Sequence, residues 1–126
     1  MTPMQVRQLP LLPKLTDVAR LEGVPRQTIY GRVRRGDFPY TVMEVSSLRH
    51  VSILEILDRS GIDPAPVLDR VNALPESMTA KQTAEVLNVR CKRVWQYLPG
   101  RVHRSTVRYA REDLIALLRS HSLAAA

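Results

Sequence analysis

An internal repeat is the feature that most constrains this chain. The segment Ala84–Trp95 repeats the segment Ala19–Tyr30 without a gap, 65 residues downstream. The matched pairs are Ala19 and Ala84, Gly23 and Asn88, Val24 and Val89, Ile29 and Val94, Tyr30 and Trp95, and, beyond the segment, Val33 and Leu98. A small residue where two helices cross, a turn residue that tolerates positive φ and apolar residues filling the corner predict two short helices at a steep angle.

This spacing is typical of a helix-turn-helix unit, and it occurs twice in 126 residues. The repeat therefore predicts two units of about 45–50 residues each. Units of this size bury only modest cores, so we expect them to pack on each other or to share a connecting helix.

Charge is partitioned along the chain in step with the repeat. The net charge is +7. Residues 1–43 carry seven Arg/Lys and three Asp/Glu, residues 44–76 carry three and six, and residues 77–126 carry nine and three. Two basic segments around an acidic connector favour a polyanionic partner, because Lys and Arg release counterions from phosphates. An ordinary solvated basic surface is the alternative.

Several classes of protein are disfavoured by what the chain lacks. Cys91 is the only cysteine, and no Cys/His cluster has zinc spacing, so neither an internal disulfide nor a metal site is expected. No catalytic set of nucleophile, base and acid and no Gly-rich phosphate loop is visible, so we expect no enzyme, cofactor or small-molecule ligand. No long apolar run or secretory signal is present, which predicts no membrane partner and a cytoplasmic location.

The expected fold class is mainly α, with two tandem (winged) helix-turn-helix units joined by a helical linker. Caps and breakers divide the chain into an irregular lead-in (1–13), a first helix-turn-helix unit (14–45), a helical linker (46–76), a second, winged helix-turn-helix unit (77–120) and a tail (121–126).

In the first unit, Thr16 is expected to cap a helix that ends at Gly23. A second helix opens at Pro25 and runs to about Arg35. Residues 36–45 are predicted to form a short hairpin or wing.

In the linker, Ser46 or Ser47 is expected to cap a long helix reaching about Ser60, and a short helix begins at Pro64 and Pro66. In the second unit, the capping box of Thr79 and Gln82 starts a helix that ends at Asn88. Another helix over 90–98, a hairpin over 101–109 and a final helix over 111–119 follow.

The outward, N-terminal face of the second helix of such a unit enters a major groove. Arg and Lys can pair with guanine edges there, and Gln with adenine. An Arg-bearing wing can enter a narrow minor groove or hold phosphates. The candidate DNA-binding residues are Arg26, Gln27, Thr28 and Arg34 in the first unit and Arg90, Lys92, Arg93, Gln96, Arg104 and Arg108 in the second. Solvated polar positions on amphipathic helices are the alternative.

Two further positions have more than one interpretation. Tyr30 and Trp95 are expected to pack their helices against the wings, with direct base contact as the alternative. Cys91 lies among basic residues at a helix start, where it is either a plain small side chain or a redox-sensitive thiol.

Residues 78–119 resemble the excisionase/MerR-like winged helix-turn-helix family through Pro99-Gly100-Arg101, Val107-Arg108-Tyr109 and Arg111-Glu112-Asp113-Leu114. Residues 15–43 resemble the same superfamily more loosely, and Arg34–Pro39 is similar to phage regulators of this group. The resemblance implies double-stranded DNA binding in a bacterial host, at the nucleoid. It also implies that the recognition-helix and wing residues fall on Arg90, Lys92, Arg93, Gln96, Arg104 and Arg108.

The ending Leu123–Ala126 resembles C-terminal tags read by ClpX-type proteases, with a plain alanine-rich tail as the alternative. A protease is therefore one candidate partner, and a recombinase or RNA polymerase is another.

Two functions fit these patterns. The leading hypothesis is a phage-type transcriptional regulator or immunity repressor that reads an asymmetric operator as a monomer, because two unlike recognition helices need no palindrome. The alternative is an excisionase-like directionality factor that bends DNA for a recombinase. A pure protein-interaction module would show no salt-dependent DNA affinity.

Overall fold

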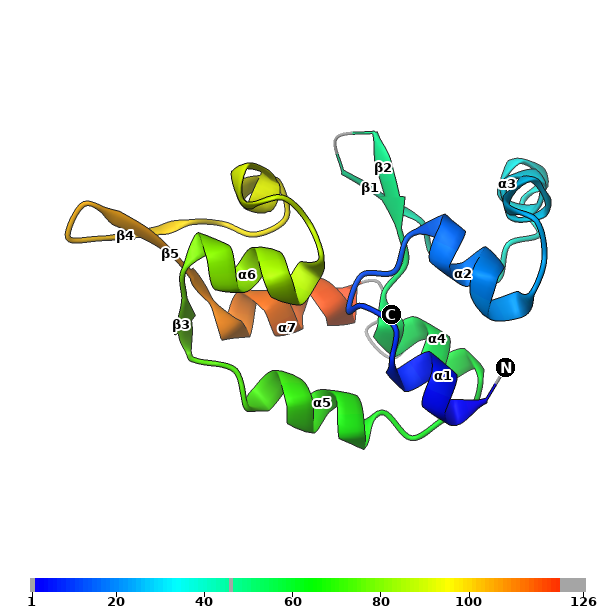
Figure 1. The fold of residues 1–126 in the computed structure, drawn as a ribbon, viewed down its shortest axis with the longest axis horizontal. Coiled ribbons are helices and arrows are strands. Elements are labelled where there is room, and N and C mark those ends of the chain that lie inside the picture. Colours follow the sequence, from blue (N-terminus) through cyan, green and yellow to red (C-terminus); the bar gives the residue numbers. More distant parts are fainter. Residues whose placement is uncertain (1, 46, 121–126) are drawn as a thin grey trace.

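The computed structural model describes residues 2–45 and 47–120, which are mainly helical with two small antiparallel sheets (Figure 1). The elements are α1 (Pro3–Arg7), α2 (Leu15–Glu22), α3 (Arg26–Arg35), β1 (Met43–Val45), β2 (Leu48–His50), α4 (Ile53–Arg59), α5 (Ala65–Asn72), β3 (Ser77–Met78), α6 (Ala80–Leu87), the 3₁₀ helix η1 (Cys91–Gln96), β4 (Arg101–His103), β5 (Thr106–Ala110) and α7 (Arg111–Ser120). No helix in the described part of the chain is long and apolar enough to cross a membrane. The predicted tail, 121–126, lies outside the described residues.

The lead-in is partly helical, so the prediction of an irregular segment was wrong. Thr2 and Gln5 form a capping box, in which the Gln5 N–H donates to Thr2 Oγ1 at 3.2 Å and the Thr2 N–H donates to Gln5 Oε1 at 2.9 Å. Pro3 then occupies the first helical position, where its missing N–H costs nothing. Val6 is fully buried and α1 packs against α4, so the N-terminal segment belongs to the core.

The helix pair α2–α3 forms where the sequence predicted it. Gly23 ends α2 at φ +69°, the left-handed conformation that glycine adopts without steric cost. The start of α2 was predicted wrongly, because the cap residue is Lys14 rather than Thr16. The Lys14 N–H donates to Asp17 Oδ2 at 2.9 Å, so the carboxylate three residues on satisfies the backbone at the helix start.

The expected long helix from Ser46 or Ser47 does not form. Strand β2 pairs with β1 instead, with Met43 opposite His50 and Val45 opposite Leu48. Ser47 lies at φ +71°, which is incompatible with a helix, and Ser46 lies outside the described residues. The hairpin predicted over 36–45 was therefore wrong in its range, because its strands are Met43–Val45 and Leu48–His50 and it spans the expected boundary at 45/46. The apolar residues from Leu48 onward fit both the spacing of a helix and the alternation of a strand. The hydrogen-bonded pairing with β1 makes residues 48–50 a strand.

Helix α4 is shorter than expected and forms the centre of the core. It begins at Ile53, where Ser52 Oγ accepts from the Leu54 N–H at 3.3 Å. Ser52 Oγ also donates to the carbonyl of Leu118 in α7 at 2.7 Å. Every residue from Ile53 to Leu57 is buried, and α4 packs on both α1 and α7. The predicted linker is thus helical in α4 but opens with strand β2, and α5 follows Pro64 as predicted.

The C-terminal half largely follows its local sequence signals. The capping box of Thr79 and Gln82 opens α6, and Asn88 ends it at φ +57°. The predicted helix over 90–98 is instead the short 3₁₀ helix η1. Side chains three residues apart eclipse in a 3₁₀ helix, so Val94 and Tyr97 face the core together.

The second hairpin is confirmed. Strands β4 and β5 pair antiparallel, with Val102 opposite Val107, and β5 also pairs with β3. The turn consists of Arg104 and Ser105, both at positive φ, as the tight two-residue turns of β-hairpins require. Helix α7 follows directly and places Leu114 and Leu118 in the core.

Candidate nucleic-acid interface

Four elements project from the helical part of the molecule (Figure 1). Helix α3, the hairpin β1–β2 and η1 lie at the top of the view, and the hairpin β4–β5 extends from its left end. Helices α1, α4, α5 and α7 lie below them. Helix α3 and η1, which the sequence proposed for binding, therefore share one side, and α1, α4, α5 and α7 lie on the other.

The cations of α3 fall into two groups. Arg32 pairs with Glu22 at 2.9 Å, and Arg35 pairs with Asp37 at 3.1 Å. Arg26 and Arg34 are exposed and form no ion pair with any residue in 2–45 or 47–120. Of the other two candidates in this helix, Gln27 is exposed and Thr28 is half-buried.

The candidate DNA-binding residues of the second half differ in their solvent exposure. Arg90 and Lys92 are exposed, and Arg104 is exposed at the tip of the hairpin. Arg93 and Gln96 are half-buried. The buried Oε1 of Gln96 has no hydrogen-bond partner among the described residues.

Arg108 is held within the protein itself. Its Nε donates to Ser77 Oγ at 2.7 Å, and its Nη2 donates to the Ser77 carbonyl at 2.8 Å. These bonds join β5 to β3. Arg101 is likewise engaged, with Glu112 at 2.8 Å and Asp113 at 3.1 Å.

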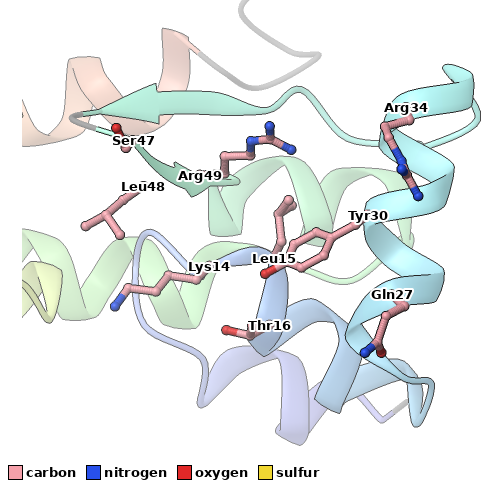
Figure 2. Close-up of a pocket in the computed structure, with 9 residues that line it drawn as sticks. All are labelled: Lys14, Leu15, Thr16, Gln27, Tyr30, Arg34, Ser47, Leu48 and Arg49. Atoms are coloured by element: carbon pink, nitrogen blue, oxygen red, sulfur yellow. The ribbon is translucent and has the colours of Figure 1, made fainter.

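Tyr30 and Trp95, at equivalent positions of the internal repeat, differ in their burial. Tyr30 is half-buried and extends from α3 across a groove toward Leu15, opposite the hairpin β1–β2 (Figure 2). Trp95 is 66% exposed, so the prediction that it packs η1 against the wing was wrong. Because η1 is a 3₁₀ helix, Val94 and Tyr97 face inward and Trp95 points outward.

A groove runs between α3, the start of α2 and the hairpin β1–β2 (Figure 2). It is lined by Lys14, Leu15, Thr16, Gln27, Tyr30, Arg34, Ser47, Leu48 and Arg49. Three of these side chains are cationic and none is acidic. A second groove is lined by Lys14, Leu48, Asn88, Val89, Arg90 and Arg93.

The two grooves adjoin, because Lys14 and Leu48 line both. We call them together the central groove, and its cations are Lys14, Arg34, Arg49, Arg90 and Arg93. Lys14 and Arg49 were not among the binding residues predicted from the sequence. Arg49 alternates with the inward-facing Leu48 and His50, so recognising the strand would have identified it as an outward cation.

Buried His50 ties the walls of the central groove together. Its Nδ1 lies 3.0 Å from the Leu12 carbonyl, and its Nε2 lies 2.8 Å from Tyr97 Oη. Because a carbonyl can only accept, Nδ1 carries the proton and Nε2 accepts from the tyrosine hydroxyl. Burial, and to a smaller degree the charge of Lys14, lowers the pKa of His50, while burial raises the pKa of Tyr97.

His50 is expected to make the protein less stable in mild acid. Its pKa is lower in the folded protein than in the unfolded chain, so its contribution to stability is complete above the unfolded value of about 6.5. That contribution declines as the pH falls below this value, where the unfolded chain binds the additional proton. Denaturant unfolding from pH 7.5 to pH 5 should show a smaller decline in His50→Gln than in the wild type. Equal declines would contradict this assignment.

No protein-family model, curated protein or solved structure matches this chain. No group of three or more His, Cys, Asp or Glu residues in the described part of the chain could hold a metal ion. The function is therefore inferred from the geometry of the projecting elements and of the central groove.

Proposed function

We propose that the protein binds double-stranded DNA sequence-specifically through two helix-turn-helix units, α2–α3 and α6–η1. In this proposal it is a phage-type transcriptional regulator or immunity repressor that reads an asymmetric operator as a monomer. The observation that carries the proposal is the placement of α3 and η1 on one side of the molecule (Figure 1). The cationic central groove, lined by residues of both α3 and η1, supports it.

The two helix pairs support the proposal at the level of their turns. Gly23 and Asn88 both adopt left-handed backbone, at φ +69° and +57°. Ile29 and Val94 are each fully buried behind the turn. The buried faces leave the polar faces of α3 and η1 free for the grooves of DNA, as in helix-turn-helix proteins.

The proposed contacts differ between the two units. In this proposal Arg26, Gln27 and Arg34 read one half-site from α3, and Arg90, Lys92 and Arg93 read the other from η1 and the residue before it. Arg104 is placed at the wing tip for a phosphate or minor-groove contact. Arg108 positions the wing through Ser77, so we assign it a supporting role.

Selection of bound sequences from random duplex DNA tests the function directly. The expected result is one asymmetric site holding two unlike half-sites, with an affinity that falls steeply as the salt concentration rises. A palindromic site occupied by two chains would reject the monomeric mode. No enrichment of any sequence would reject specific recognition.

Trp95 provides an intrinsic readout of binding. It is the only tryptophan, and it is exposed on η1. Its fluorescence is expected to be quenched when the selected duplex is added, and to saturate at one duplex per chain. Trp95→Phe should abolish the signal and so confirm its source. Unchanged emission at DNA concentrations that shift all the protein in a gel would show that η1 stays away from the DNA.

A directionality factor is the second candidate, and one observation favours it. Val102 and Val107 face each other across the second hairpin and are 77% and 45% exposed. Strand β4 is also the edge of its sheet. Such an apolar edge could contact a neighbouring protein on DNA, such as a recombinase. Strong DNA bending and cooperative gel shifts on repeated sites, without repression of a reporter, would favour this candidate over a repressor.

A further inference from the structure

We propose that the central groove binds the DNA backbone between the two half-sites and fixes their spacing and helical phase. The proposal rests on the proposed function and adds a third point of contact to it, the hairpin β1–β2 with Lys14. It predicts that the protein recognises its half-sites only at one separation.

Lys14 and Arg49, which were not predicted from the sequence, connect the two recognition elements. Figure 2 shows Arg49 extending from β2 toward α3, while Lys14 extends away from α3. Lys14 lines the second groove together with Arg90 and Arg93 of the η1 side. Arg49 therefore continues the positive surface of α3, and Lys14 continues that of η1.

The charge of this groove is not neutralised by its own walls. No Asp or Glu lines either groove. Glu44 is the cross-strand partner of Arg49, yet the described structure contains no ion pair between them. Asp17 accepts from the backbone N–H of Lys14 and leaves its ammonium group free to bind elsewhere. Lys14 and Arg49 are therefore available for the phosphates that lie between the bases proposed for the cations of α3 and of the η1 side.

The walls of the groove are rigidly connected. Lys14 forms a β-bridge with His50, and the Val51 N–H donates to the Pro13 carbonyl at 2.9 Å. His50 in turn bonds Tyr97, which directly follows η1. The hairpin, the start of α2 and the end of η1 thus share one buried network. Helix α3 is joined to this network through its packing on α2, so we expect the two recognition elements to keep one relative orientation.

A spacing series tests the fixed phase. One to ten base pairs are inserted between the half-sites of the selected duplex. An insertion of about five base pairs turns the second half-site by about half a helical turn. We expect it to reduce the affinity to that of a single half-site. Wild-type affinity for the five-base-pair insertion would show that the two elements orient independently and would overturn the proposal.

Charge-neutralising variants test the groove contact. Lys14→Gln and Arg49→Gln are each expected to lower the slope of log affinity against log salt by about 1, with an unchanged base preference. Arg70→Gln removes the same charge from α5, on the far side of the molecule, and should leave the slope unchanged (Figure 1). Thermal unfolding of each variant verifies that it folds.

The outcomes separate the two levels of the proposal. A wild-type chain without salt-dependent affinity for duplex DNA would overturn both the function and this inference. A wild-type chain that binds, together with groove variants whose salt slopes equal that of Arg70→Gln, would overturn the groove contact alone.

Discussion

Replacing Ile56 with alanine is expected to lower the free energy of unfolding by about 2–5 kcal/mol, the range for large-to-small changes at fully buried sites. Ile56 is 0% exposed in α4, which packs on α1 and on α7. Because this helix serves both halves of the chain, the loss should destabilise both. Denaturant unfolding measures the magnitude, and hydrogen exchange of the α2 and α6 amides reports on each half.

The conservative change Ile56→Val is the matched control, with an expected loss of about 0.5–1.5 kcal/mol. It keeps the prediction testable even if the alanine variant does not fold. Within each variant, the free energy of amide protection should fall by the same amount in α2 as in α6. A loss of protection in one half alone would show that the halves have separate cores, and the fixed groove between them would then lack its physical basis.

The double substitution of Arg26 and Arg93 is expected to have the largest effect on DNA affinity. Each single change to alanine should cost roughly 1–3 kcal/mol of binding free energy and relax the base preference in its own half-site. The two residues lie on different recognition elements, so their effects should add. Fluorescence anisotropy at fixed salt measures the affinities, and sequence selection with each variant identifies the position that loses preference.

If the losses of binding free energy in the two single variants add in the double variant, the chain reads two half-sites. If they do not, only one of the two helices reads bases. If only α3 entered a groove, Arg93→Ala would act as a loss of general charge and change the salt slope without changing base preference. Arg70→Gln is again the control for a positive charge lost far from the groove, and it also removes the hydrogen bond from Arg70 to the Arg7 carbonyl. A base preference that survives both arginine substitutions would remove these two side chains from the recognition surface.

Local signals in the sequence predicted much of the helical framework. Gly23 and Asn88 identified both turns, because few other residues adopt left-handed backbone without strain. The capping box of Thr79 and Gln82 identified the start of α6. The exposed cations Arg26 and Arg90 were predictable from the internal repeat.

The first hairpin and the central groove were not predictable in this way. Leu48 and Val51 fit a helical spacing as well as a strand, and the choice depends on the pairing of β2 with Met43–Val45. His50 is buried against Leu12 and Tyr97, which lie 38 and 47 residues away from it in the sequence. No local pattern reveals such partners.

The sequence by itself determined the turns at Gly23 and Asn88 and the starts of α5 and α6, because caps and left-handed residues act within about four positions. Only the tertiary structure decided that Lys14 and Arg49 join the cations of α3 and η1 in one groove. That arrangement requires α1, α4 and α7 to form a single core, and packing between distant segments is set by the whole chain.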